Sequence, residues 1–455
     1  MWRNLDSVYF VGIGGIGMSA LARFFHNRGK HVAGYDRTST SLTDQLTREN
    51  IDIHFIDKPA LIPAEFLDPD RTLVIYTPAI PDNNLELNYF RNNGFRIIKR
   101  SMALGEVFNA GYGVAVAGTH GKTSVSTMIA HILAASSTGC NAFLGGISKN
   151  FNSNLVIHPT SNYVIAEADE YDRSFLSLLP DIAVITSMDN DHMDIYDSRE
   201  NLVAGFEAFI AQIKDLGKLV YKHGLELDFP EKVDVITYSL KESNADYHVV
   251  NYEIINGKYH FTVKTPDYIF ETVLGVPGLL NVENMLAAIA VTDQLGIPVE
   301  QISSACRTYK GVKRRFDVQF SGSDRIYIDD YAHHPEELKA FITSVRELYP
   351  GKRITGIFQP HLYSRTRDFS TEFAESLSLL DELILLEIYP AREEPIPGVT
   401  SDLIFREVSI IEKVLISKEQ LINVLRERDP ELLLTMGAGD IDKLVEPLKS
   451  WMETR

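Results

Sequence analysis

The sequence predicts an α/β protein of three domains, on the basis of three observations. The chain has 455 residues, and a domain typically has about 100–200. Short apolar runs alternate with helical patterns along almost the whole chain, which is typical of repeated βαβ units with parallel sheets. The alternation restarts after the glycine-rich residues 111–113 and again after the basic residues 310–315. We therefore expect α/β domains at 1–108, 109–314 and 315–455.

The individual elements follow from apolar periodicity. Met18, Leu21, Ala22 and Phe25 recur at helical spacing and predict a helix between the first two strands. Within 246–276, Tyr, Val, Ile and Thr alternate with other residues, which predicts an antiparallel addition to the second sheet. Strands are expected at 8–11, 31–35, 73–76, 114–117, 163–166, 182–185, 326–328, 354–358, 383–386 and 432–434.

Composition and charge exclude several classes of protein. Apolar residues make up 45% of the chain, enough for packed cores. The formal charge of −18 opposes binding to nucleic acid or to an anionic membrane surface. Only Cys140 and Cys306 occur, too few for a disulfide framework, which suits a reducing compartment. Glycines interrupt the apolar segment 8–25, and no other stretch approaches the length of a membrane span. We expect a cytoplasmic protein without membrane insertion, either a monomer or a weak homodimer.

The first chemical motif is a glycine fingerprint. Gly12, Gly14 and Gly17 lie between a predicted strand and helix, and Asp36 ends the next predicted strand. Such glycines let the backbone approach a diphosphate at a helix N-terminus, and the acid can accept from a ribose hydroxyl. NAD or FAD, another diphosphate ligand, and a purely structural turn all remain open from this motif alone.

The second motif, Gly118–Thr123, is a short phosphate loop between a predicted strand and helix. Backbone N–H groups there can cradle a triphosphate, Lys122 can reach its terminal phosphates, and the Thr123 hydroxyl can bind Mg²⁺. Acidic loops follow the next two predicted strands, at 167–172 and 189–194. Because ligands collect at the carboxyl ends of parallel strands, Glu167 is a candidate magnesium ligand.

The last domain adds two polar loops, at 329–337 and 359–368. Arg365 and Arg367 can clamp a carboxylate or a phosphate. For the pair His333-His334, capping and packing are favoured over a metal site, because no thiol or third ligand has suitable spacing. The residues alone thus indicate an Mg-ATP-dependent enzyme with a second site for a diphosphate ligand.

The order of these motifs resembles the Mur ligase family, most closely its alanine-adding members. The matching segments are 12–18, 77–80, 118–123, 167–172, 191–194, 281–284, 314–316, 330–335, 361–367 and 436–439. The resemblance implies Rossmann-like first and third domains around a central ATPase domain. It also implies ATP-dependent amide formation through an acyl phosphate in peptidoglycan precursor synthesis, with UDP-N-acetylmuramate and L-alanine as substrates and ATP with two Mg²⁺ ions.

The resemblance further assigns roles to residues. UDP-sugar binding would involve Gly12, Gly14, Gly15, Ile16, Gly17, Met18, Asp36, Thr77, Pro78 and Ala79. ATP binding would involve Gly118, Thr119, His120, Gly121, Lys122, Thr123, Ser124, Asn281, Asn284, Arg315 and Asp330. Metal ligands would be Thr123, Glu167 and His192, and the catalytic groups Lys122, His192 and Arg315. Amino-acid binding would involve His334, His361, Arg365 and Arg367.

Three residues depart from the family pattern. Leu280 replaces a histidine that contacts adenine in many relatives, and Leu362 replaces an arginine beside the amino-acid site. Glu207 stands where several relatives have a carbamylated lysine, so no modified lysine is expected. The closest rival is a recycling ligase that adds a preformed tripeptide to the same UDP-sugar. A second alternative is a nicotinamide-dependent dehydrogenase, but such an enzyme would have no use for the phosphate loop. A third is a non-catalytic nucleotide-regulated scaffold, but such a protein would not need acidic loops beside the phosphate loop.

Overall fold

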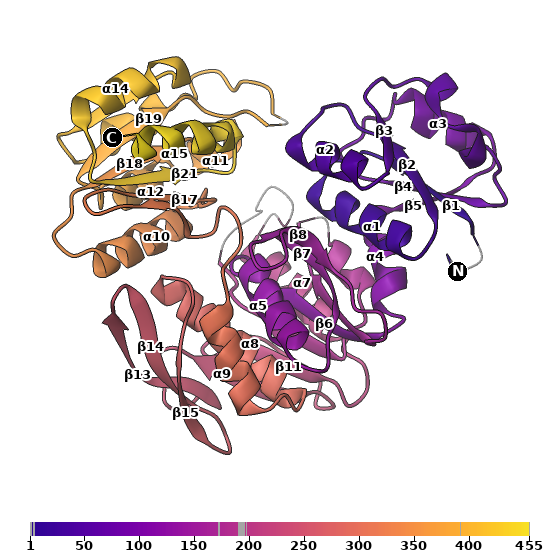
Figure 1. Cartoon of the computed structure of the whole chain (residues 1–455), viewed down its shortest axis with the longest axis horizontal. Coiled ribbons are helices and arrows are strands. Elements are labelled where there is room, and N and C mark those ends of the chain that lie inside the picture. The colour runs from indigo at the N-terminus through magenta and orange to yellow at the C-terminus, as the bar shows by residue number, and fades with distance from the viewer. Residues whose placement is uncertain are drawn as a thin grey trace. The chain divides into compact units, whose positions relative to one another are not determined.

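The computed structural model describes residues 2, 5–171, 173–189, 196, 198–391 and 393–454. It contains three sheets flanked by helices, one sheet within each predicted domain (Figure 1). The α/β class is confirmed, whereas the seams at 108 and 314 stay predictions. By contacts the chain forms two compact units. Unit 1 holds Met1–Asn251, Phe261–Thr272 and Asn284–Lys310, and unit 2 holds Tyr252–His260, Val273–Glu283 and Gly311–Arg455.

The first sheet is parallel and five-stranded, in the order β3-β2-β1-β4-β5. Strand order reverses between β1 and β4, the position at which ligands bind to open α/β sheets. The predicted apolar stripe of α1 is confirmed, because its members are at most 1% exposed. The elements are β1 (Ser7–Val11), α1 (Ile16–Asn27), β2 (His31–Tyr35), α2 (Ser41–Arg48), β3 (Asp52–His54), η2 (Pro59–Leu61), η3 (Ala64–Phe66), β4 (Thr72–Tyr76), α3 (Leu85–Asn92), β5 (Arg96–Lys99) and α4 (Arg100–Phe108).

The second sheet has ten strands, in the order β15-β14-β13-β12-β11-β10-β6-β9-β7-β8. Its centre is parallel, and β6 lies between β9 and β10. The predicted antiparallel addition is confirmed: only two residues connect β13 and β14, which allows no parallel crossover. The elements are β6 (Tyr112–Ala117), α5 (Lys122–Ala135), β7 (Asn141–Ser148), β8 (Ser153–Val156), β9 (Tyr163–Glu167), η4 (Ser174–Ser177), β10 (Ile182–Ile185), α7 (Arg199–Ile210), β11 (Lys218–Lys222), β12 (Asp234–Ser239), β13 (Tyr247–Ile255), β14 (Lys258–Lys264), β15 (Ile269–Val273), α8 (Leu279–Gln294) and α9 (Val299–Thr308).

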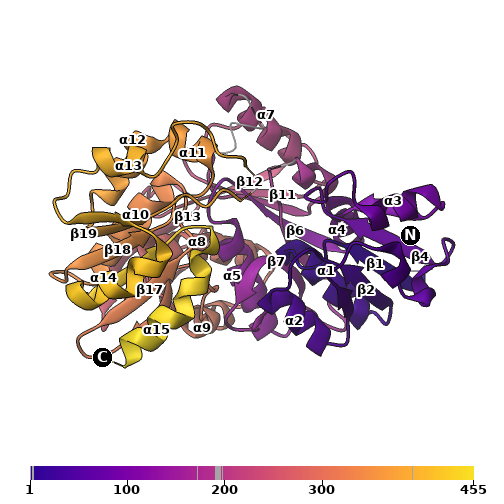
Figure 2. The same cartoon turned by 90° about the horizontal axis from the view of Figure 1, so that it is seen from above.

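Within unit 1, α1 of the first sheet packs against β7 and β8 of the second. Figure 2 shows α1 beside β7. One apolar core runs through both, from Phe24 and Phe25 on α1 to Phe143 and Leu155 on these strands. The two sheets of unit 1 are therefore held together by a shared core rather than by a linker alone.

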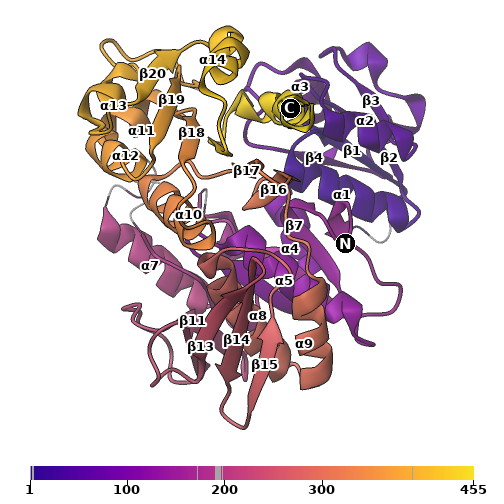
Figure 3. The same cartoon turned by 60° about the vertical axis from the view of Figure 1, so that its left-hand side comes forward.

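The third sheet, in unit 2, has the order β16-β17-β21-β18-β19-β20, and only the β16–β17 pair is antiparallel. Strands β18, β19 and β20 lie side by side in Figure 3. Tyr327, Ile357 and Leu433 pack against α14 and α15 on one face. The elements are β16 (Asp317–Ser321), β17 (Ile326–Asp330), α10 (Pro335–Leu348), β18 (Ile354–Phe358), α11 (Tyr363–Asp368), α12 (Ser370–Leu377), β19 (Glu382–Leu386), α13 (Asp402–Glu407), β20 (Lys413–Ile416), η5 (Lys418–Gln420), α14 (Leu421–Arg428), β21 (Leu432–Met436), η6 (Asp440–Leu444) and α15 (Val445–Glu453).

Across the described residues, no helix is both long enough and apolar enough to cross a membrane.

Candidate active site

The phosphate loop connects β6 to α5, as predicted. Gly118 has a φ of +127°, and a Cβ there would lie 2.2 Å from Thr186 Oγ1, so no other residue fits. Ser187 Oγ accepts a hydrogen bond from the His120 backbone N–H at 2.8 Å and lies 3.0 Å from Thr119 Oγ1. Residues at the end of β10 therefore hold the loop in place. The backbone N–H groups of the loop lie at the N-terminus of α5, which favours binding of an anion there.

Lys122 begins α5 and lies among acids. Its ammonium donates to Glu170 Oε1 at 2.8 Å and to the Gly118 carbonyl at 2.6 Å. Burial alone would lower the pKa of this ammonium, but Glu170, Glu167 and Asp169 outweigh burial and raise it. Lys122 is therefore charged at neutral pH, and its carboxylate neighbours hold it at the base of the loop.

Thr123 and Glu167 lie together, as the metal prediction requires. The Thr123 hydroxyl donates to Glu167 Oε2 at 2.8 Å. Gly145 on β7 packs directly behind this carboxylate, and a Cβ there would lie 1.8 Å from Glu167 Oε2. A hydroxyl and a carboxylate at a phosphate-binding helix N-terminus are the hard oxygen ligands that Mg²⁺ prefers. Ser124 follows in the same turn and is buried.

The first glycine loop follows β1 at the strand-order reversal. A Cβ at Gly12 would lie 2.5 Å from Thr77 Cγ2, so this loop touches the one after β4. The Gly14 N–H donates to Asp36 Oδ2 at 2.7 Å. Asp36 thus organises the loop itself, a contact that the motif spacing did not predict. Of the other predicted sugar-binding residues, Gly15, Ile16, Pro78 and Ala79 are exposed, whereas Met18 is buried.

Both sheets of unit 1 contribute to one cavity of about 300 Å³. Residues of the first glycine loop and Thr77 line it from the first sheet, and Gly145, Glu167 and Asp169 from the second. The structure therefore brings the predicted UDP-sugar loop and the predicted metal carboxylate to the same space.

Arg100, at the start of α4, also lines this cavity. A Cβ at Gly17 would lie 2.9 Å from Arg100 Nη1, so the half-buried guanidinium lies against the first turn of α1. Arg100 was not predicted as a site residue, because nothing in the local sequence shows which residue of α4 faces the glycine loop. A cation at this point suits the binding of a diphosphate or a carboxylate.

In unit 2, Arg315 and Asp330 lie close together. The Asp330 carboxylate accepts the Phe316 and Ala332 backbone N–H groups, each at 2.7 Å. Burial raises the pKa of Asp330 to about 6, although Arg315 opposes the shift. Arg315 lies over the Tyr331 ring at 5.0 Å.

The predicted amino-acid residues also lie in unit 2. His334 is buried at the N-terminus of α10, and its ring meets the Phe369 ring edge-on at 5.1 Å. The His361 ring stacks on Tyr389 at 5.9 Å. On α11, Arg365 is half-buried, whereas the exposed Arg367 donates to its neighbour Asp368 at 2.7 Å.

The remaining predicted residues lie on α7, on α8 and outside the residues that the structure describes. Asn284 Oδ1 would lie 2.8 Å from a Cβ at Gly121, which places this amide beside the phosphate loop. Asn281, one turn earlier on α8, donates to the Pro277 carbonyl at 2.6 Å. Glu207 on α7 accepts the Asp228 N–H at 3.1 Å. His192 lies outside the described residues, among which no cluster of three potential metal-binding His, Cys, Asp or Glu side chains occurs.

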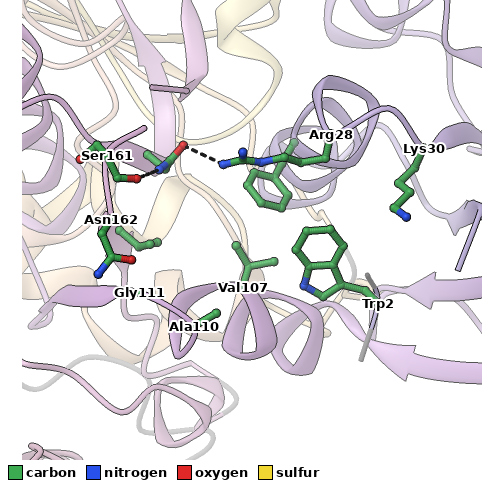
Figure 4. Close-up of a pocket in the computed structure, with 11 residues that line it drawn as sticks. Trp2, Arg28, Lys30, Val107, Ala110, Gly111, Ser161 and Asn162 are labelled. Carbon is green, nitrogen blue, oxygen red and sulfur yellow. Dashed lines mark hydrogen bonds between the residues drawn. The ribbon is translucent and has the colours of Figure 1, made fainter. Parts of the chain in front are cut away.

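A second cavity, of about 390 Å³, is shown in Figure 4. Whereas the first cavity reaches the C-terminal end of β9, this second cavity lies at the N-terminal ends of β7 and β9. Trp2, Arg28, Lys30 and Val107 contribute to its wall, with Asn162 just before β9. None of the predicted site residues that the structure describes lines it, so it is separate from the cavity beside the first glycine loop.

Comparison with known proteins extends over the whole chain. Family profiles match in chain order: "Mur ligase family, catalytic domain" at residues 7–112, "Mur ligase middle domain" at 116–292, and "Mur ligase, glutamate ligase domain" at 314–439. The protein named UDP-N-acetylmuramate–L-alanine ligase in Parabacteroides distasonis is 51% identical over 450 residues, which cover 98% of this chain and 97% of that protein.

Two further proteins of the same family also match over the whole chain. The protein of the same name in Porphyromonas gingivalis is 50% identical over 454 residues, covering 99% of this chain and 100% of that one. Among solved structures, the UDP-N-acetylmuramate–alanine ligase of Thermotoga maritima matches with a TM-score of 0.83 at 28% identity, over 99% of this chain and 100% of the other. From its first sheet to its last, this chain belongs to the Mur ligase family.

Proposed function

We propose that the protein joins L-alanine to the lactyl carboxylate of UDP-N-acetylmuramate, with ATP converted to ADP and phosphate. The observation that carries the proposal is the shared cavity, where the first glycine loop and Glu167 line the same space. A diphosphate held at the N-terminus of α1 would bring its attached sugar acid toward the phosphate loop. The names of relatives about 50% identical over the full length support the same reaction.

In the first step, a carboxylate oxygen of the sugar acid attacks the γ-phosphorus of ATP. A new oxygen–phosphorus bond forms, the bond to the bridging oxygen breaks, and ADP leaves. Lys122 stabilises the charge that develops on the transferring phosphoryl group, and Arg315 is proposed to do the same. Removing one such contact typically costs about 10²–10³ in rate.

In the second step, the alanine nitrogen attacks the acyl carbon, the carbon–oxygen bond to phosphate breaks, and the nitrogen loses a proton. His334 and His361 are proposed to line the alanine site. Arg365 is the better candidate for the alanine carboxylate, because it is half-buried, whereas Arg367 is exposed. Asn281 and Asn284 are proposed to contact adenine. Each Asp330 oxygen accepts one backbone N–H and retains a lone pair for the ATP ribose.

Thr123 and Glu167 fit a divalent cation, because their oxygens lie 2.8 Å apart at the helix N-terminus where phosphates bind. Mg²⁺ held there would offset the negative charge of the triphosphate. A second Mg²⁺ at His192 stays a prediction. We place the reaction in the cytoplasm, where ATP is available.

The decisive experiment is phosphate release from ATP with each substrate omitted in turn, with the amide product measured in parallel. We expect product only when ATP, UDP-N-acetylmuramate and L-alanine are all present. A preformed tripeptide should replace L-alanine poorly. Lys122→Met should abolish the reaction, whereas the control Lys241→Met, at an exposed surface lysine, should not change it.

Other outcomes would contradict the proposal. A preference for the tripeptide would assign the protein to the recycling reaction. Binding of NADH that is unaffected by Lys122→Met, with no phosphate release, would favour the dehydrogenase.

A further inference from the structure

A buried amide joins the two sheets of unit 1 behind the first glycine loop. Asn154 on β8 is fully buried, and its Nδ2 donates to the Ile16 carbonyl at 2.5 Å and to Ser19 Oγ at 3.0 Å. The Ser19 hydroxyl in turn donates to the same Ile16 carbonyl at 2.9 Å. A side chain of the second sheet therefore bonds the first turn of α1, where the proposed diphosphate site lies.

The oxygen of the Asn154 amide also accepts a hydrogen bond. Asn154 Oδ1 accepts from Arg23 Nη1 at 2.5 Å. Arg23 is 5% exposed and forms a two-pronged pair with Glu49, at 2.7 and 2.9 Å. Because a buried guanidinium is costly when it lacks partners, this network fixes the orientation of the amide.

The connection continues to the phosphate loop. Strand β8 pairs with β7, and β7 pairs with β9, at whose end Glu167 lies. On β7, Gly145 packs against the Glu167 carboxylate. Ile16 and Glu167 line the same cavity. The path from the sugar loop to the metal carboxylate thus runs through Asn154 on β8 and across the adjacent strand β7 to β9.

We propose that Asn154 is a positioning residue, which holds the first glycine loop at a fixed distance from Glu167 so that the sugar carboxylate meets the γ-phosphate of ATP. This inference rests on the proposed function and adds a residue outside the lining of the cavity. Asn154→Asp keeps the size and the acceptor for Arg23, but it removes both donors to α1.

The expected effect is selective. A misplacement of about 1 Å can cost about 10² in rate, so Asn154→Asp should lower kcat/KM for UDP-N-acetylmuramate by about tenfold to hundredfold. The Kd of ADP should change less than twofold, because the phosphate loop lies on other elements. More ATP should also be hydrolysed per amide formed, since a displaced acceptor leaves the phosphoryl group to water.

Asn141→Asp is the matched control, because Asn141 is also a buried amide, on β7, and its Oδ1 accepts from Arg28 at the other end of α1. Asn141→Asp should lower the melting temperature without changing kcat/KM or coupling. If Asn154→Asp fails to fold, Ser19→Ala removes only the hydroxyl of the network and should change the same parameters in the same direction, to a smaller extent.

The inference is overturned if kcat/KM and coupling are unchanged in a folded Asn154→Asp protein. If Asn154→Asp does not fold, the inference is overturned if both parameters are unchanged in Ser19→Ala. Failure of the proposed function is seen separately, as wild-type protein that forms no amide from L-alanine. In that case binding of UDP-N-acetylmuramate to wild type and Asn154→Asp still tests the positioning role, and equal affinities reject it.

Discussion

Gly145→Ala should impair the reaction while leaving the fold intact. A Cβ at this position would lie 1.8 Å from Glu167 Oε2, whereas ordinary contacts begin at 3.4 Å. The carboxylate must therefore retreat by about 1.6 Å, the difference between these two distances, because the backbone of β7 is less free to move than a side-chain terminus. The retreat breaks the 2.8 Å hydrogen bond from Thr123.

The size of the effect follows from that displacement. A misplacement of about 1 Å can cost about 10² in rate, so kcat should fall by at least about 100-fold, equivalent to about 2.7 kcal/mol of transition-state stabilisation. Stability should change by only about 1 kcal/mol or less, because Gly145 is exposed and its φ is not left-handed.

The assay is phosphate release at saturating substrates over a range of Mg²⁺ concentrations. Gly145→Ala should lower kcat and raise the Mg²⁺ concentration needed for half-maximal rate. Glu167→Asp shortens the side chain and removes the clash, so the double variant should lose less activity than the two single effects combined. A Gly145→Ala protein with wild-type kcat and Mg²⁺ dependence would refute the placement of Glu167 at the metal.

Three further predictions concern buried titratable groups. Lys122→Met should destabilise the protein by about 3–5 kcal/mol, because it removes the ammonium that lies 2.8 Å from the buried Glu170 carboxylate. Adding Glu170→Gln to Lys122→Met should restore stability but not nucleotide binding. A double variant as unstable as Lys122→Met alone would contradict this prediction. Burial raises the pKa of Glu86 from 4.5 to about 7, so the folded protein holds a proton that the unfolded chain releases, and stability should fall as pH rises between these values. Glu86→Gln should flatten this decline in thermal midpoint, and an unchanged slope would contradict the assignment. Burial raises the pKa of both Cys140 and Cys306 to about 12, so neither thiol should react with iodoacetamide at pH 8 until urea is added; labelling of the native protein would disprove this.

Local sequence patterns predicted the parts of the fold that depend on local periodicity. The apolar stripe of α1 and the strand–loop–helix context of Gly118–Thr123 were both identified correctly. The missed strands include β3 (Asp52–His54), β16 (Asp317–Ser321) and β20 (Lys413–Ile416), which are edge strands. The sequences of β3 and β16 lack the continuous apolar runs that marked the predicted strands, as expected of edge strands that bury less apolar surface. β20 has such a run at 414–416 and was overlooked, and the interior strands β7, β11 and β12 were also missed.

Site residues within a recognisable sequence motif could be predicted. Site residues that reach the site only through tertiary contacts were harder to predict. Glu167 was expected near the phosphate loop, and its hydrogen bond with Thr123 agrees with that expectation. Arg100 and Asn154 were missed, because their partners are on α1, far away in the sequence. Asp36 was expected to contact a ligand, and no spacing rule indicated its hydrogen bond with the Gly14 N–H.

The central claim is that the carboxylate of a UDP-sugar is phosphorylated by the ATP held at the phosphate loop. It is tested most directly with UDP-N-acetylmuramate whose lactyl carboxylate carries heavy oxygen, incubated with ATP and L-alanine. If an acyl phosphate forms, one heavy oxygen per turnover should appear in the released inorganic phosphate, as mass spectrometry would show. Release of unlabelled phosphate together with amide product would contradict the account.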